Sequence, residues 1–312
     1  MLDENVMAVP YELLILGAAV KIGMIELLSE KKLNSRDLAL ELKADARAVW
    51  VIAEALAALG YLVKEEESYH LSAEARDRIY NSDAANYTGF AFMHRYNQIV
   101  SWLSLPEVIL SGRPYPRERE PENTAYFMSA MRYSARQSAQ ALAEYLLAGA
   151  GAGIRVLDLG GGPLAHARAL TSCGARVTVL DLPEVVKKMK DEAAAAGIEM
   201  IPGDFNIALP PGPFELVLLS NICHIYGESE NQALFLRVNQ ALAPGGRIAI
   251  VDIVRDTNPF AAVFGINMLA CTLHGGTWTW PQYSSWLEAA GFGAAKLTEV
   301  NGKQLIIAEK NK

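Results

Sequence analysis

Long hydrophobic runs, paired cysteines and an excess of positive charge are all missing from this sequence. The longest apolar run near the amino end, LLILGAAV, covers eight residues before Lys21, whereas a membrane-spanning helix needs roughly 20. No cationic stretch precedes this run and no cleavage site follows it. We therefore expect neither a signal peptide nor a membrane anchor, and we expect the protein to be cytoplasmic.

The three cysteines, Cys173, Cys223 and Cys271, stand far apart and form no C-x-x-C pair. This spacing predicts neither a disulfide framework nor a zinc site, and we expect no metal. The net charge is -7 with no long block of one sign, which makes nucleic acid a poor partner. With 312 residues and 51% apolar content, the chain is long enough for about two domains. These features are typical of a cytosolic enzyme.

Residues 1–83 predict a small helical domain. Apolar residues recur at spacings of three and four over residues 10–30, which predicts one amphipathic helix. Asn34 with Ser35 and then Asp45 can cap a second and a third helix, and Gly60 can end the third. YLV and YHL flank a charged turn and predict a hairpin. The order of three helices and a hairpin is that of a winged helix.

Winged helices often bind DNA, but the charges here disfavour it. Residues 1–83 hold nine Lys and Arg against fifteen Asp and Glu, a net charge of -6, and the third helix carries a single cation, Arg47. Phosphate contacts need the opposite sign. We therefore expect the apolar faces of this domain to pack against a second copy of the chain, giving a homodimer.

Residues 84–312 predict the larger domain. Residues 84–148 are rich in aromatic and Met side chains and look helical; they can form a connecting core or wall an apolar pocket. From residue 149 on, five short apolar strands alternate with helices, which predicts a Rossmann-like, mostly parallel sheet. The Asn301-Gly302 pair between two alternating runs predicts an antiparallel hairpin at the end. The fold class is therefore α/β with an amino-terminal winged-helix domain.

Three acids follow or lie near the ends of successive predicted strands. VLDLGGGPLAHA supplies a strand, three glycines and a helix, a turn that lets a ligand approach the backbone, with Gly160 and Gly162 at its ends. Asp158 stands inside this turn, where a carboxylate would repel a pyrophosphate but could bind a cationic amino acid moiety. Asp181 ends the next strand, 23 residues later, and suits the hydroxyls of a ribose. Asp204 ends the third strand.

These acids suit a cationic nucleoside without phosphate. Asp204 is placed to accept from an adenine amino group, and Phe205 to cover the ring. S-adenosylmethionine meets this description. Each acid taken alone could instead be a helix cap or a solvated loop residue. The predicted cofactor residues are Asp158, Gly160, Gly162, Asp181, Leu182, Asp204, Phe205 and Ser220.

With these motifs the chain resembles the S-adenosylmethionine-dependent O-methyltransferases of the plant caffeate and bacterial polyketide, hydroxyindole and carotenoid type, in which an amino-terminal winged helix makes the dimer. In that family the fourth strand is followed by His-Asp-Trp, and here HIY stands in its place. ALAPGGRIAIVD matches the family's next strand with its terminal acid. The resemblance implies that His224 is the general base and that Asp252 steadies it. A phenol is a weaker acid than imidazolium by about 5 kcal/mol, so proton transfer is expected to accompany methyl transfer.

The sequence departs from the family pattern at three places. Pro163 and Leu164 stand where the family's glycine turn continues Thr-Gly. Ile225 and Tyr226 replace the Asp and Trp of the signature. The family's Gly-Gly-Lys-Glu, whose Glu is a second acid against the base, is GGTW at residues 275–278.

The predicted reaction is methyl transfer to a hydroxyl of a small, apolar, aromatic acceptor. The predicted acceptor pocket is lined by Phe127, Met131, Asn267, Met268, Cys271 and His274. Two rival hypotheses stay open. One keeps the cofactor but changes the chemistry to methylation of carbon or nitrogen, or to a reaction without methyl transfer such as decarboxylation or hydroxylation. The other is a winged-helix transcriptional regulator.

Overall fold

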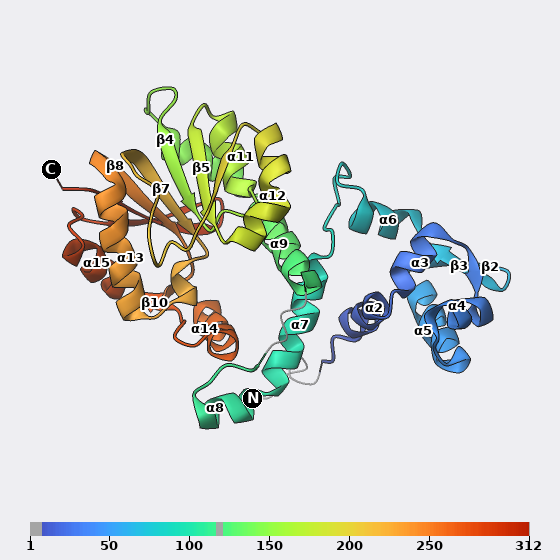
Figure 1. The fold of residues 1–312 in the computed structure, drawn as a ribbon. Helices are drawn as coiled ribbons and strands as arrows, with labels where there is room; N and C mark the ends of the chain where they lie inside the picture. Colours follow the sequence, from blue (N-terminus) through green and yellow to red (C-terminus); the bar gives the residue numbers. More distant parts are fainter. Residues whose placement is uncertain (1–7, 117–120, 312) are drawn as a thin grey trace. The chain divides into compact units, whose positions relative to one another are not determined.

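The chain divides into two compact units in the computed structural model, which describes residues 8–116 and 121–311 (Figure 1). The first unit comprises Met1–Val100 and Arg119–Tyr133, and the second comprises Ser101–Glu118 and Ser134–Lys312. The stretch 84–148, which the sequence suggests is one connection, is shared between them. The domain boundary at residue 83 stays a prediction.

Short helices and a small antiparallel sheet make up the first unit. Its elements are α2 (Tyr11–Lys21), α3 (Met24–Glu30), β1 (Leu33–Asn34), α4 (Ser35–Leu42), α5 (Ala46–Ala58), β2 (Leu62–Glu65), β3 (Ser68–Leu71), α6 (Ala73–Tyr80), the first part of α7 (Ala91–Leu103) and most of α9 (Pro121–Ala135). The strand order is β1-β3-β2. The side chains of Asn34 and Asp45 cap α4 and α5 as the sequence predicts.

One predicted helix of this unit is wrong. The sequence pattern suggests a single helix over residues 10–30, but α2 ends at Lys21 and α3 begins at Met24. Gly23 between them has a φ of +79°, in the left-handed region that glycine adopts without steric cost. The apolar spacing continues across this break because both helices contribute to one core.

A seven-stranded sheet forms the second unit, in the order β11-β12-β8-β7-β4-β5-β6 (Figure 1). The strands are β4 (Arg155–Leu159), β5 (Arg176–Asp181), β6 (Glu199–Pro202), β7 (Phe214–Ser220), β8 (Leu242–Val251), β11 (Lys296–Val300) and β12 (Lys303–Glu309). Strands β4 to β8 pair in parallel, and β12 runs antiparallel to β8 and β11. The predicted Rossmann-like sheet and its antiparallel end are confirmed.

The second unit also contains helices. They are the end of α7, α8 (Leu105–Ser111), α10 (Ala139–Leu147), α11 (Ala165–Ser172), α12 (Pro183–Ala195), α13 (Glu228–Ala241), α14 (Pro259–Cys271) and α15 (Trp280–Ala289). A short parallel pair, β9 (Val254–Arg255) with β10 (Trp278–Thr279), lies beside them. Within residues 8–116 and 121–311 no helix is long and apolar enough to cross a membrane.

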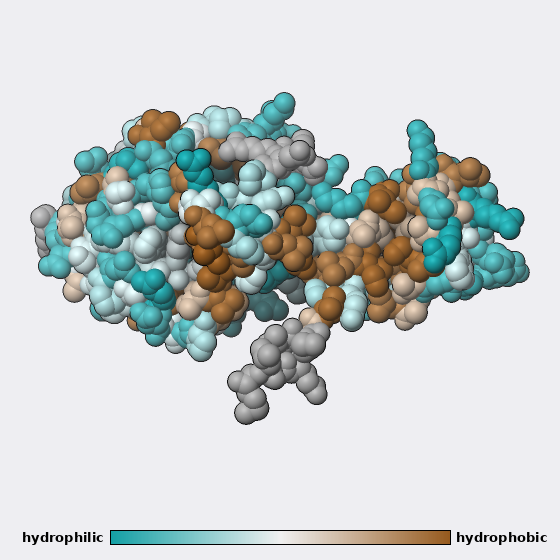
Figure 2. All heavy atoms as spheres, turned by 90° about the horizontal axis from the view of Figure 1, so that it is seen from below, coloured by the Kyte–Doolittle hydropathy of each residue, from teal (hydrophilic) through white to brown (hydrophobic). Residues whose placement is uncertain are grey.

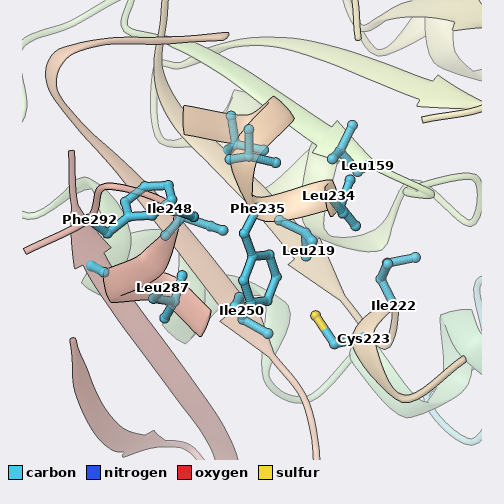
Figure 3. Packing of buried hydrophobic residues seen from close by; sticks show 14 of the residues in the cluster. Leu159, Leu219, Ile222, Cys223, Leu234, Phe235, Ile248, Ile250, Leu287 and Phe292 are labelled. Carbon is cyan, nitrogen blue, oxygen red and sulfur yellow. The ribbon is translucent and has the colours of Figure 1, made fainter. Parts of the chain in front are cut away.

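One hydrophobic core of the second unit joins the central strands to the helices α13 and α15. Phe235, Leu287 and Phe292 pack there against Leu219 and Ile250 of the central strands (Figure 3). The side chain of Cys223 also belongs to this core. The backbone just after β7 is thereby anchored one residue before His224.

Candidate active site

The glycine turn after β4 is packed tightly against its surroundings. Gly160 has a φ of +68°, and a Cβ there would lie 2.6 Å from Cδ1 of Ile222. A Cβ on Gly161 would meet the Asp158 carboxylate at 2.2 Å, and one on Gly162 would meet the Asp181 carboxylate at 2.7 Å. Any larger residue would displace these groups. The glycines therefore allow the turn to pack closely against Ile222, Asp158 and Asp181, at the carboxyl edge of the sheet where α/β folds bind ligands.

Asp158 is a buried carboxylate without a partner. Its side chain is 1% exposed, and neither oxygen has a hydrogen-bond partner among the described residues. Burial, with a smaller contribution from the charge of Asp181, raises the pKa of Asp158 to about 8. An unpaired buried charge is costly, so this group calls for a cationic or donor ligand.

Asp181 is already bonded to the backbone around it. Its Oδ2 accepts from the Gly162 N–H at 2.8 Å, and its Oδ1 accepts from the Leu182 N–H at 2.7 Å. Burial raises the pKa of Asp181, whereas these two bonds act in the opposite direction. Each carboxylate oxygen keeps a second lone pair that can accept from a hydroxyl.

The residues after β6 bring an aromatic ring to the glycine turn. The Asp204 side chain accepts from the Asn206 N–H at 2.8 Å, and Phe205 is buried, with one ring carbon 3.6 Å from the Cβ position of Gly160. Tyr226 contacts Phe205 edge-on, with ring centroids 5.8 Å apart. Tyr226, at the aromatic position of the family's His-Asp-Trp signature, thus packs against Phe205.

Leu164 holds a strained backbone conformation. It stands where the related glycine turn ends in Gly, and its φ is +62° while its side chain is fully buried. A left-handed conformation costs a non-glycine residue roughly 1–2 kcal/mol. Removing a buried Leu side chain costs about 2–5 kcal/mol. The packing contribution is the larger, so the side chain stabilises the turn despite the strain.

We therefore expect Leu164→Gly to destabilise the protein by about 1–3 kcal/mol, although it relieves the strain. Denaturant unfolding of the wild type and the variant measures the difference. An increase in stability would show that the backbone conformation, and not the packing, dominates at this position.

His224 and Asp252 form a close pair. His224 lies in a short 3₁₀ turn (Cys223–Ile225) after β7, and Asp252 directly follows β8. The imidazole Nδ1 lies 2.6 Å from Oδ1 of Asp252, and the His224 N–H donates to Oδ2 at 3.1 Å. The exposed fractions of the two side chains are 8% and 0%. A carboxylate on Nδ1 leaves Nε2 as the nitrogen that can take a proton from another group.

The backbone around His224 is fixed from three sides. The Gly276 N–H donates to the His224 carbonyl at 3.0 Å. The Trp278 indole N–H donates to the Cys223 carbonyl at 3.0 Å, and the Asn231 amide donates to the same carbonyl at 2.9 Å. Trp278 stands where the related enzymes have the second acid. In this chain Trp278 therefore holds the backbone of the turn in place of an acid.

Two residues near this site are missed by the sequence patterns. His166, which the sequence suggests is a surface or packing residue, is half-buried with its Nε2 3.0 Å from Oγ of Ser220. Burial lowers the pKa of His166 to about 4. Phe264 on α14 contacts the His224 ring edge-on at 5.0 Å. The position of His166 four residues after Gly162 is a signal that could have drawn attention to it.

The predicted acceptor residues are divided between the two units. Phe127 and Met131 lie on α9 in the first unit, where the Phe127 ring contacts His94. Asn267, Met268 and Cys271 lie on α14 in the second unit, and Oδ1 of Asn267 accepts from Trp102 Nε1 at 3.4 Å. His274 is exposed and pairs with Glu230 at 3.2 Å.

Comparison with known proteins identifies the family. Residues 112–293, more than half of the chain, match the model of the O-methyltransferase domain. The chain belongs to the O-methyltransferase family. This match confirms the enzyme class predicted from the sequence, and the SAH and SAM held by related structures agree with the predicted cofactor, S-adenosylmethionine.

Relatives of this O-methyltransferase act on different atoms. A 3-hydroxy-5-methyl-1-naphthoate 3-O-methyltransferase from Streptomyces sahachiroi is 27% identical over 297 residues, covering 88% of this chain and 84% of the relative. An L-tyrosine C(3)-methyltransferase from Streptomyces lavendulae is also 27% identical, covering 89% and 82%. Among solved structures, PigF with SAH has a TM-score of 0.79 at 21% identity and covers 96% of each chain.

Proposed function

We propose that this O-methyltransferase methylates a hydroxyl of a small, apolar, aromatic acceptor, with His224 as the general base. The observation that carries the proposal is the 2.6 Å contact between His224 Nδ1 and the fully buried Asp252 carboxylate. Such a pair fixes the tautomer in which Nε2 is the free acceptor and stabilises the imidazolium that forms. The relative that methylates a hydroxynaphthoate supports an aromatic acceptor.

The cofactor fits the residues at the carboxyl edge of the sheet. S-adenosylmethionine, when bound, supplies a sulfonium methyl group for displacement by the acceptor oxygen. Asp158 would lose its proton and accept from the α-ammonium group, which gives its unpartnered oxygens a donor. Asp181 and Leu182 would hold the ribose, and Asp204 with Phe205 the adenine. Gly160, Gly162 and Ser220 would complete the proposed cofactor site.

Proton removal by His224 is the step assigned to the chain's own side chains. Nε2 takes the hydroxyl proton as the oxygen–carbon bond forms, and Asp252 balances the new positive charge on the ring. The edge-on contact of Phe264 with the His224 ring would restrict rotation of the imidazole. Fixed orientation of the oxygen toward the methyl group supplies much of the rate.

The acceptor would contact apolar side chains. Asn267, Met268 and Cys271 on α14 and His274 are the proposed lining in the second unit. A role of Phe127 and Met131 in acceptor binding stays a prediction from the sequence. Apolar side chains remain exposed along α14, at Phe260, Val263, Ile266 and Leu269, with Leu273 just beyond it, and Figure 2 shows apolar patches on the face that is seen from below. An apolar wall with few polar groups suits an aromatic ring.

We further propose a cytoplasmic homodimer formed through a winged-helix domain over residues 1–83. Trp50 and Val51 on α5 are 49% and 45% exposed, on the helix that would read DNA in a regulator. Exposed apolar residues and a net charge of -6 favour a protein partner over phosphate. Light scattering reports the dimer, and a gel shift at low salt tests the regulator hypothesis.

The test of function is calorimetry followed by an acceptor screen. We expect S-adenosylmethionine and S-adenosylhomocysteine (SAH) to bind to the full chain, and phenolic acceptors, including hydroxynaphthoates, to receive radiolabelled methyl groups. Binding of a nicotinamide dinucleotide in place of these nucleosides would contradict the proposal.

Methylation of carbon is the second candidate. The C(3)-methyltransferase among the relatives favours it, as does Trp278 at the position of the second acid. His224→Ala does not separate the two reactions, because methylation at an aromatic C–H also releases a proton. The position of a ¹³C-labelled methyl group in the product does separate them.

A further inference from the structure

An asparagine in the first turn of α13 bonds to the segment that carries His224. The side chain of Asn231 is fully buried. Its Nδ2 donates to the carbonyls of Cys223 at 2.9 Å, Tyr226 at 3.1 Å and Gly227 at 3.0 Å. Because this nitrogen carries two hydrogens, at least one of them is shared between two carbonyls. One amide thus connects α13 to the backbone both before and after the histidine.

The other atom of this amide has no partner. Three carbonyl oxygens face one end of the side chain of Asn231, and only the nitrogen end can donate to them, which fixes the orientation of the amide. Its Oδ1 is therefore turned away from the carbonyls, where it is buried and makes no hydrogen bond with any described residue. An unsatisfied buried oxygen costs free energy and calls for a specific explanation. The three bonds to the turn are that explanation.

The remaining supports of this backbone come from the loop that follows α14. The Trp278 indole donates to the Cys223 carbonyl, and the Gly276 N–H donates to the His224 carbonyl. Within the part of the chain that the structure describes, Asn231 is the side chain that bonds to carbonyls on both sides of His224. The turn is thus held between α13 and this loop, and the direction of the imidazole depends on both.

We propose that Asn231 is a positioning residue for His224, holding the backbone of the 3₁₀ turn so that Nε2 keeps a fixed direction toward the acceptor hydroxyl. A misplacement of about 1 Å can cost roughly 100-fold in rate. The support acts through backbone carbonyls, so it does not depend on the side chains of Ile225 and Tyr226, which differ from the family's signature. This inference rests on the proposed role of His224 as the general base.

A double-mutant cycle between Asn231 and His224 tests this role. Leu has the same branching at Cγ as Asn but no donor, so Asn231→Leu removes the three bonds. We expect kcat for a phenolic acceptor to fall roughly 10–100-fold, while the acceptor KM and the SAH affinity change by less than about threefold. In a His224→Ala background the same replacement should leave kcat unchanged, because Asn231 acts through the imidazole.

Asn239→Leu is the matched control. Asn239 lies farther along α13, and its Nδ2 donates to the Gly291 carbonyl at 3.2 Å. Its replacement also removes an amide donor from a backbone carbonyl, but away from His224, so the variant should keep wild-type kcat. If Asn231→Leu does not fold, Asn231→Ala replaces it in the cycle with the same expected results.

Hydrogen exchange gives a second measurement that needs no methyl transfer. The His224 N–H donates to Oδ2 of Asp252 at 3.1 Å, and its exchange can be followed by NMR in protein labelled with ¹⁵N-histidine. We expect this amide to exchange at least about tenfold faster in Asn231→Leu, because the turn opens more often, and at the wild-type rate in Asn239→Leu.

Wild-type kcat in Asn231→Leu would overturn this role, as would an equal loss of kcat in both backgrounds or an unchanged exchange rate of the His224 amide. Failure of the proposed function has a different result. If His224→Ala keeps wild-type kcat, the general base is contradicted. If His224→Ala is impaired while Asn231→Leu is not, the role of Asn231 alone is contradicted.

Discussion

Replacement of His224 by Ala is expected to lower kcat for a phenolic acceptor by about 10²–10⁴-fold. The variant loses the only proposed proton acceptor, while in-line positioning of the acceptor continues to give a residual rate. The glycine turn, Asp158 and Asp181 do not depend on the imidazole. SAH affinity should therefore change by less than about threefold, which calorimetry can measure beside the steady-state kinetics.

His70→Ala serves as the control for this prediction. His70 lies on β3 in the first unit, with its Nδ1 near the Leu71 carbonyl, and the variant should keep wild-type kcat. Asp252→Asn should also lower kcat, because an amide can present the wrong partner to Nδ1 and does not balance the imidazolium charge. A His224→Ala enzyme with near wild-type kcat on a phenol would remove the base from the mechanism.

Asp158→Asn is expected to stabilise the protein without cofactor and to weaken cofactor binding. The pKa of Asp158 is raised from 3.8 to about 8 in the folded state. Its folded carboxyl therefore keeps a proton that the unfolded chain releases, and stability falls as pH rises from about 4 to 8. An amide has no such titration. The difference in the free energy of unfolding between the variant and the wild type should therefore increase by up to about 1.4 kcal/mol per pH unit in this window, in favour of the variant.

Asp158→Asn should lower the affinity for SAH although it raises the stability of the free protein. The amide cannot offer a charge-assisted acceptor to the α-ammonium group, so we expect a loss of roughly 10–100-fold in affinity. Asp191→Asn, at an exposed acid on α12, is the matched control for both measurements. Parallel stability curves for Asp158→Asn and wild type between pH 5 and 8, or unchanged SAH affinity, would show that this carboxylate is satisfied in another way.

The parallel sheet could be predicted because local patterns specify it. Five apolar runs bounded by turns match β4 to β8, and Asn301-Gly302 places the last hairpin, with φ values of 47° and 75°. The break at Gly23 is harder to predict because apolar spacing of three and four continues across it. Only the left-handed conformation at Gly23 interrupts the helix.

The site could be predicted only in part for a different reason. Asp158, Asp181 and Asp204 are found because strand ends meet at one edge of a parallel sheet. The pairing of His224 with Asp252 across 28 residues follows from the resemblance and not from periodicity. His166 is brought to Ser220 by the packing of α11 near the end of β7, which no local pattern encodes. The left-handed conformation of Leu164 could not be predicted either, because the burial that offsets its strain cannot be read from the sequence.

Transfer of a ¹³C-labelled methyl group tests the central claim most directly. Wild-type enzyme is incubated with methyl-labelled S-adenosylmethionine and the phenolic acceptor that reacts best, and NMR of the product identifies the atom that carries the label. The account predicts an aryl methyl ether, formed by wild type and almost absent with His224→Ala. A label on carbon or nitrogen, or equal ether formation by both proteins, would contradict it.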